Sequence, residues 1–118
     1  MSLRVWVYQG CDTCRKARKF LAERKIPHEL IAIREQPPGV AELRVMLAHL
    51  RGDLRRLFNT SGQDYRALNM KERLSSLSVD DALALLAAHG NLVKRPFVLG
   101  QDFGATGFQA EEWVRLLA

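Results

Sequence analysis

The chain opens with a short apolar run that ends at a turn. Five of the six residues from Leu3 to Tyr8 are apolar, and aromatic or β-branched residues follow one another around Val7. Such a run is typical of a strand that is buried on both faces. Gly10 interrupts the pattern, so we predict a strand over 3–8 followed by a turn.

The next segment, Asp12 to Lys25, has the periodicity of an amphipathic helix. Its apolar face consists of Cys14, Ala17, Phe20 and Leu21. Pro27 ends the helix, and the apolar residues of 28–33 predict a second strand. A strand, a helix and a strand within roughly 30 residues form a βαβ unit, whose strands run parallel with a right-handed crossover.

Residues 36–91 carry helical patterns with no strand among them. An apolar stripe begins at Val40, is interrupted at Gly52 and resumes until Phe58. Ser78 begins a capping box for a last helix in this stretch. We therefore predict an all-helical insert over 36–91.

The C-terminal part returns to strands. Residues 94–100 predict a third strand with a proline at its start, where proline is tolerated. After a turn, 105–108 predicts a short fourth strand and 109–118 a closing helix. The last two strands pair as a hairpin, so the sheet is mixed.

The length of 118 residues suits one domain. We expect a single α/β domain over 1–118. Its core of 1–35 and 92–118 holds a mixed four-stranded sheet, and the helical insert stands between strands 2 and 3.

Composition narrows the class of protein. No apolar run approaches the roughly 20 residues of a membrane span, and no signal-peptide pattern precedes the first strand. We therefore expect a cytoplasmic protein without a membrane segment. The formal charge of +5 suits acidic partners or small oxyanions. Because the basic residues are scattered and no helix-turn-helix pattern accompanies them, solvated faces are the simpler explanation and direct nucleic-acid binding is not expected.

The two cysteines, Cys11 and Cys14, stand at the turn between the first strand and the first helix. A thiol there meets the free N–H groups and the positive dipole end of the helix, which favour the reactive thiolate. A Cys-x-x-Cys pair beside a βαβ unit is a redox pattern. Cys11 is the predicted nucleophile because it is nearer the N–H groups, and Cys14 is the predicted resolving thiol. Arg15 would lower the pKa of Cys11, and Asp12 would oppose it.

Two alternatives to redox chemistry remain open from the residues alone. The pair can be two structural, half-buried thiols. Zinc would need about four ligands, and neither a second Cys-x-x-Cys nor a suitable histidine spacing supplies them, so we expect no metal.

Arg95 and Pro96 form a second candidate feature. An X–Pro bond can be cis, and a hairpin beside the first strand would bring Pro96 near the cysteine turn. Arg95 would then meet a thiolate or an anion there. Taken without the fold, the sequence favours the alternative, in which Pro96 starts a strand and Arg95 is exposed.

Several motifs together resemble the ArsC/Spx family from end to end of the chain. They are Tyr8-x-x-Cys11-x-x-Cys14-Arg15-Lys16-Ala17, Leu57-Phe58-Asn59-Thr60-Ser61-Gly62-x-x-Tyr65-Arg66-x-Leu68, Leu92-Val93-Lys94-Arg95-Pro96-Phe97 and Gly107-Phe108. The resemblance implies a thioredoxin-like fold of the glutaredoxin type, a cis-proline at Pro96 and a reactive Cys11. We expect Thr13, Arg15 and Arg95 to support the thiolate or an anion beside it.

The family contains arsenate reductases, which use one cysteine and three arginines, with glutathione and glutaredoxin as reductants. Cys11 and Arg95 match two of these four positions. Asn59 stands where the second arginine is expected, and 101–107 contains no third one. The resemblance therefore implies weak oxyanion binding.

The family also contains Spx-like regulators, which use the Cys-x-x-Cys as a switch and bind the C-terminal domain of the RNA polymerase α subunit. Gly52 matches the glycine of that contact, although it also suits a plain helix break. We predict a thiol–disulfide oxidoreductase with a Cys11/Cys14 pair, no bound cofactor, and glutathione, glutaredoxin or thioredoxin as its reductant. A Spx-like regulator is the alternative.

Overall fold

The strands form one mixed four-stranded sheet in the computed structural model, which describes residues 3–117. They are β1 (Leu3–Val7), β2 (His28–Ala32), β3 (Phe97–Leu99) and β4 (Gly104–Thr106), in the spatial order β2–β1–β3–β4. β1 pairs with β2 in parallel and with β3 antiparallel, and β3 pairs with β4 antiparallel. The predicted βαβ unit, terminal hairpin and mixed sheet are confirmed.

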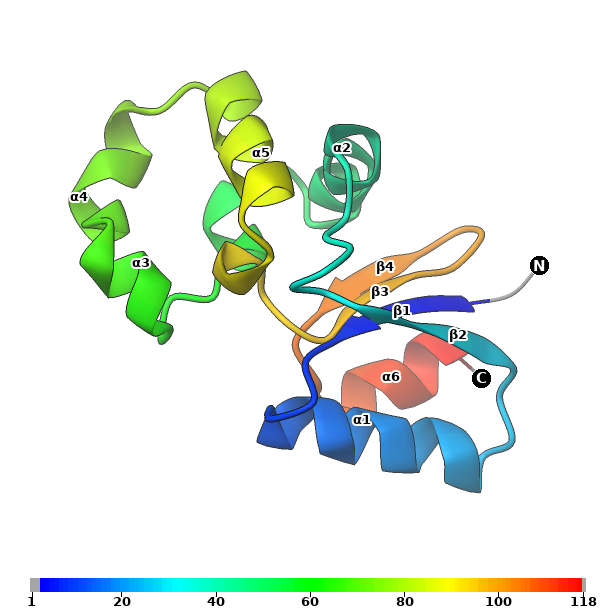
Figure 1. Ribbon diagram of the computed structural model, residues 1–118. Coiled ribbons are helices and arrows are strands. Elements are labelled where there is room, and N and C mark those ends of the chain that lie inside the picture. Colours follow the sequence, from blue (N-terminus) through cyan, green and yellow to red (C-terminus); the bar gives the residue numbers. More distant parts are fainter. Residues whose placement is uncertain (1–2, 118) are drawn as a thin grey trace.

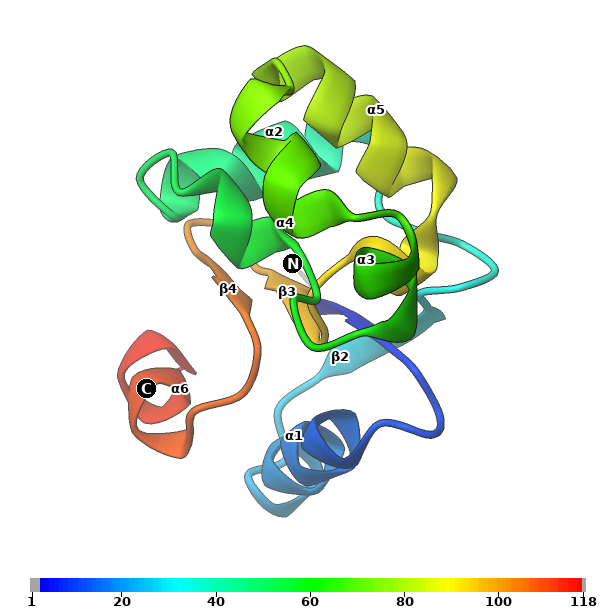
Figure 2. The same cartoon turned by 90° about the vertical axis from the view of Figure 1, so that its left-hand side faces the viewer.

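Helices lie on both faces of the sheet (Figure 1 and Figure 2). One face carries α1 (Asp12–Glu23) and α6 (Ala110–Leu117). The other face carries the insert, which is a run of short α-helices and 3₁₀ helices (η) between β2 and β3. Its elements are α2 (Val40–His49), η1 (Leu54–Leu57), α3 (Gln63–Ala67), α4 (Met70–Arg73), η2 (Leu74–Ser76), α5 (Val79–Ala88) and η3 (Gly90–Leu92).

Alternation along the strands divides the core into two clusters. Val5 and Val98 are partners across β1 and β3, and both pack against Trp113 of α6 in one cluster. The next pair, Trp6 and Phe97, points to the opposite face and packs with the insert. Their rings meet edge to face, with centroids 5.2 Å apart. Because successive side chains of a strand point to opposite faces, the same strands contribute residues to both core clusters.

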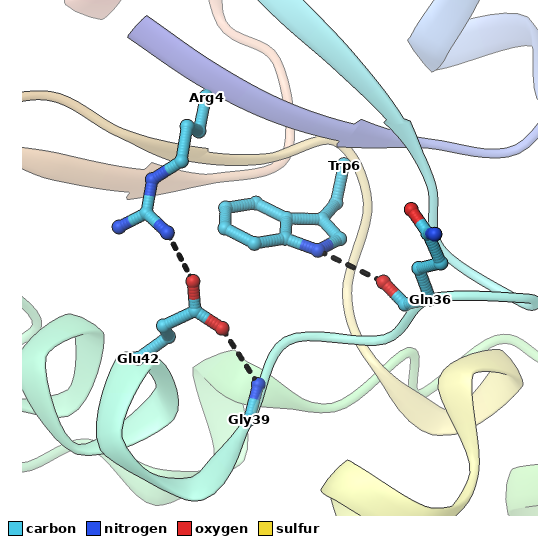
Figure 3. A network of polar contacts seen from close by, with 5 residues as sticks. All are labelled: Arg4, Trp6, Gln36, Gly39 and Glu42. Atoms are coloured by element: carbon cyan, nitrogen blue, oxygen red, sulfur yellow. Dashed lines mark hydrogen bonds and ion pairs between the residues drawn. The ribbon is translucent and has the colours of Figure 1, made fainter.

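Polar contacts connect the beginning of the insert to β1 (Figure 3). Arg4 forms an ion pair with Glu42 of α2, and Glu42 Oε1 accepts a hydrogen bond from the Gly39 N–H at 2.8 Å. Trp6 Nε1–H donates to the carbonyl oxygen of Gln36 at 3.0 Å. The Gly39 N–H is one of the groups at the start of α2 that the helix itself leaves unpaired, and the other two contacts link the beginning of the insert to β1.

The end of the insert is held by a close backbone contact. A Cβ placed on Gly90 of η3 would lie 2.0 Å from the carbonyl oxygen of Ile33, just beyond β2. Gly90 is buried, so a side chain at this position could not avoid the contact by turning toward solvent. The segment that leads from η3 to β3 therefore begins from a fixed position against the sheet.

The structure differs from the predicted elements in two places. Between Phe58 and Ser78, where the predicted insert has no helix located, two short helices, α3 and α4, follow each other, with Asn69 between them at φ +54°. The fourth strand ends at Thr106 because Gly107 adopts φ +75° and leaves the extended conformation. None of the helices within 3–117 combines the length and the apolar character needed to cross a membrane.

Candidate functional site

Cys11 occupies the N-cap position of α1, directly after the β1 turn. Its backbone N–H donates to the carbonyl oxygen of Tyr8 at 3.1 Å, which closes the turn. Its Sγ accepts a hydrogen bond from the backbone N–H of Cys14 at 3.3 Å. The sulfur thus takes the place of the capping oxygen at a helix N-terminus, where backbone N–H groups and the dipole stabilise negative charge.

The two thiols differ in exposure and in acidity. Both are free, with Cys11 partly exposed and Cys14 only 1% exposed. Burial raises the pKa of Cys11, but hydrogen bonds from Cys14 and the positive charge of Arg95 together outweigh it, so this pKa lies below its ordinary value. Burial raises the pKa of Cys14 to about 12, and the neighbouring Cys11 adds to the rise. Cys11 is therefore the thiol that ionises first.

Arg95 reaches the site from the segment before β3. The antiparallel pairing of β3 with β1 brings this segment beside Tyr8, and the Arg95 guanidinium lies 4.9 Å from the centre of the Tyr8 ring. The Arg95–Pro96 peptide bond is cis. Nη1 of Arg95 is buried and has no hydrogen-bond partner within 3–117. A buried guanidinium nitrogen is costly to leave unpaired, so it is well suited to meet a thiolate or an anion.

The other predicted residues lie in different surroundings. Arg15 is 76% exposed at its side chain and forms an ion pair with Asp12, so the positive charge that acts on Cys11 comes from Arg95. Thr13 follows Cys11 in α1 and lines a neighbouring cavity. Gly52, at φ +80°, lies in the exposed turn between α2 and η1 and faces open space. Over residues 3–117, no three His, Cys, Asp or Glu side chains gather as metal ligands.

Two cavities lie near the cysteine turn, one reaching it through Thr13 and the other through Tyr8 and Arg95, and neither could be predicted from the sequence. The first, of about 480 Å³, is lined by Thr13 and by three cations, Arg55, Arg56 and Lys94, with Asp53 as its acidic residue. We call it the cationic cavity. Its cations come from η1 and from the segment before β3, and no spacing in the sequence relates these two regions.

The second cavity, of about 330 Å³, includes Arg95, the residue whose charge acts on Cys11. It is lined by both kinds of charge and by polar amides: Tyr8, Arg34, Asn59, Gly62, Gln63, Asp64, Asn91 and Arg95. We call it the mixed-charge cavity. Lys94 and Arg95 are consecutive residues, yet they line different cavities. Two separate charged cavities therefore include residues close to the cysteine turn, Thr13 in one and Tyr8 with Arg95 in the other.

Replacing Arg95 with glutamine is expected to raise the pKa of Cys11, because the charge that stabilises its thiolate is lost while a polar side chain remains. The ultraviolet absorbance of the thiolate, followed against pH, measures this pKa. Arg15→Gln is the matched control, and we expect a smaller change because that guanidinium is exposed and already paired with Asp12. An equal shift in both variants would contradict the placement of Arg95.

Comparisons with known proteins place this site in a family. The profile of the ArsC family matches residues 6–116. The uncharacterized protein YusI of Bacillus subtilis (strain 168) is 42% identical over 96% of this chain and 96% of its own length. The global transcriptional regulator Spx of Enterococcus faecalis (strain ATCC 700802 / V583) is 29% identical over 98% of this chain and 86% of its own.

A solved structure related to the same family shares the fold. The crystal structure of an ArsC family related protein from Bacteroides fragilis superposes with a TM-score of 0.92 at 36% identity, over 98% of both chains. The architecture of this chain, including the helical insert between β2 and β3, is therefore the thioredoxin-like architecture that the resemblance implied.

Proposed function

The chain belongs to the ArsC family, and from the two thiols at its α1 N-terminus we propose that it is a thiol–disulfide oxidoreductase. The observation that carries the proposal is the contrast between the two cysteines. One is accessible with a lowered pKa, and its neighbour is buried with a pKa of about 12. A dithiol reductase needs one cysteine that attacks as a thiolate and a second, resolving thiol that reacts only afterwards.

In the first step, the Cys11 thiolate attacks one sulfur of a substrate disulfide. The S–S bond of the substrate breaks, one thiolate leaves and takes a proton from solvent, and Cys11 is left in a mixed disulfide. The Cys14 N–H and the Arg95 charge that stabilise the thiolate support this role for Cys11. We expect the Arg95 charge to stabilise the anionic leaving group as well.

In the second step, Cys14 attacks the mixed disulfide and the second substrate thiol leaves, so that Cys11 and Cys14 become a disulfide. Cys14 must lose a proton for this attack. Its pKa is raised by burial and also by the Cys11 charge, and the second contribution disappears once Cys11 is in a neutral mixed disulfide. Two electrons, from two glutathione molecules that become glutathione disulfide or from one glutaredoxin or thioredoxin dithiol, return the pair to the reduced state.

Arsenate fits this site less well than a disulfide does. Asn59 replaces one of the arginines of the family's arsenate reductases, and 101–107 contains no other. Each lost charge-assisted hydrogen bond is worth about 1.5–3 kcal/mol. Cys14 also provides a resolving thiol inside the protein, which the single-cysteine arsenate mechanism does not use.

The test is turnover of the purified protein with glutathione as the electron donor, on a small disulfide and on arsenate separately. We expect disulfide reduction well above the uncatalysed exchange and little reduction of arsenate. Absence of turnover on the disulfide with glutathione, glutaredoxin and thioredoxin alike would end the enzyme proposal.

A second candidate function is a redox-controlled contact with the RNA polymerase α subunit, as in Spx-like regulators. It is favoured by the Spx relatives and by the exposed turn at Arg51 and Gly52, whose left-handed φ values of +59° and +80° give it a defined shape. Binding of the α C-terminal domain to the oxidised and reduced protein tests it. Negligible binding in both states would exclude this candidate.

A further inference from the structure

The mixed-charge cavity near Cys11 is lined by two arginines, Arg34 and Arg95, and by Asp64, which forms no ion pair with either of them. We propose that it binds the zwitterionic α-amino-acid end of a peptide thiol or its disulfide, with Arg34 on the carboxylate and Asp64 on the ammonium. The inference rests on the proposed function, because the thiol chemistry at Cys11 supplies the reason for such a ligand to bind there.

Arg34 is the cation of this cavity that is open to a ligand. It follows β2, and its guanidinium lies 5.1 Å from the centre of the Tyr8 ring while Nη1 donates to the Tyr8 hydroxyl at 3.2 Å. Arg95 lies against the same ring at 4.9 Å. Within residues 3–117, neither arginine forms an ion pair. Two guanidinium groups held on one ring are a ready site for a carboxylate.

Asp64 supplies the opposite charge from α3. It is half-buried, and its carboxylate makes no ion pair or hydrogen bond with any side chain or backbone group of the described chain. Asp64 and Arg34 line this cavity together, and they also line an adjoining one of about 240 Å³. A half-buried carboxylate without a partner gains most from a ligand that brings a cation to it.

The charge arrangement selects a zwitterion over a simple ion. An anion alone would meet Asp64 without a partner for it, and a cation alone would meet two arginines. An α-amino-acid group satisfies both, and the amides of Asn59, Gln63 and Asn91 offer donors and acceptors around it. The cationic cavity on the other side, with Arg55, Arg56 and Lys94, suits a carboxylate without an ammonium.

The positions of the two cavities fit a ligand whose thiol lies between its charged ends. Tyr8 precedes Cys11 and lines the mixed-charge cavity, whereas Thr13 follows Cys11 and lines the cationic one. A peptide such as glutathione has a zwitterion at one end, a carboxylate at the other and its sulfur between them. Bound across the turn, it would present that sulfur to Cys11.

The experiment measures the rate at which Cys11 forms a mixed disulfide, in a Cys14→Ser background so that the adduct persists. The probes are the disulfides of glutathione, of glutaryl-cysteinylglycine, which lacks the ammonium, and of γ-aminobutyryl-cysteinylglycine, which lacks the α-carboxylate. Mass spectrometry follows the adduct. We expect each missing charge to slow the reaction about tenfold, as for one charge-assisted hydrogen bond.

Variants assign each charge to its residue. Arg34→Gln should slow the reaction of Cys11 with glutathione disulfide about tenfold, and this variant should then react equally fast with the disulfide that lacks the α-carboxylate. Asp64→Asn should likewise slow the reaction with glutathione disulfide about tenfold and react equally fast with the disulfide that lacks the ammonium. Arg66→Gln and Asp102→Asn, exposed residues outside both cavities, are the matched charge controls and should leave the rates unchanged. Unchanged thermal melting shows that each variant is folded.

Two outcomes overturn different claims. If Cys11 reacts readily but equally with all three disulfides, or if Arg34→Gln and Asp64→Asn keep both penalties, the zwitterion site is wrong while the proposed function stands. If Cys11 reacts with none of them faster than a free cysteine does, the proposed function itself fails.

Discussion

Replacing Cys11 with serine is expected to abolish disulfide reduction completely. A serine hydroxyl at the α1 N-terminus is not ionised at neutral pH and cannot form a disulfide. The mixed disulfide with the substrate therefore cannot form, and Cys14 has no mixed disulfide to attack. Cys14 cannot take over, because it is 1% exposed and burial raises its pKa to about 12. Turnover of a small disulfide by the purified variant checks this.

Cys14→Ser is the matched control, because it removes the other thiol of the pair. We expect it to keep the first step and lose the second, so that one substrate half remains attached to Cys11 and turnover stops unless an external thiol releases it. Intact mass after one equivalent of disulfide distinguishes the two variants. A stable adduct on Cys11→Ser would contradict the assignment of the nucleophile.

Gly90→Ala is expected to lower the free energy of unfolding by about 3 kcal/mol or more. The new Cβ would lie 2.0 Å from the Ile33 carbonyl oxygen and 2.9 Å from its carbonyl carbon. Both are backbone atoms, so η3 and the end of β2 would have to move apart. Because Arg34 and Asn91 adjoin this contact and line the mixed-charge cavity, the geometry of the site should suffer as well. Urea unfolding measures the loss.

Gly39→Ala provides the comparison, since it adds the same methyl group at the other end of the insert. Its Cβ would meet only Glu42 Oε1 at 3.6 Å, an ordinary contact, and Gly39 has φ −78°. We expect a cost below about 1 kcal/mol, mainly from the change of N-cap residue. An equal loss of unfolding free energy in the two variants would show that the close backbone approach at Gly90 does not make an added methyl group costly.

The fold could be predicted well from the sequence because its signals are local. Apolar runs, the Pro27 break and the spacing of Cys14, Ala17 and Leu21 locate β1, α1 and β2, and the short 100–104 connection predicts the hairpin. Two short helices separated by a left-handed Asn69 were not predicted, because helices of four or five residues leave no clear period.

The candidate site was only partly predictable. The cysteine pair is visible as a motif, and its position at the α1 N-terminus follows from the turn before it. Arg34, by contrast, reaches the site only because β2 ends beside Tyr8. Asp64 comes from an insert helix whose position depends on tertiary packing. The sequence suggested both Arg15 and Arg95 as cations near Cys11, and which of them acts on the thiol depends on side-chain direction. In the structure the charge that lowers the pKa of Cys11 is that of Arg95, whereas Arg15 is exposed and paired with Asp12.

The central claim, that Cys11 is the thiolate of this protein, is tested most directly by the order in which the two cysteines alkylate. Thiolate content rises as pH rises through the pKa, so a lowered pKa moves labelling of Cys11 to lower pH than that of a free cysteine. We predict that limited iodoacetamide at neutral pH, read by peptide mass spectrometry, modifies Cys11 first and leaves Cys14 intact. Labelling of Cys14 before Cys11, or of both at one rate, would contradict the account.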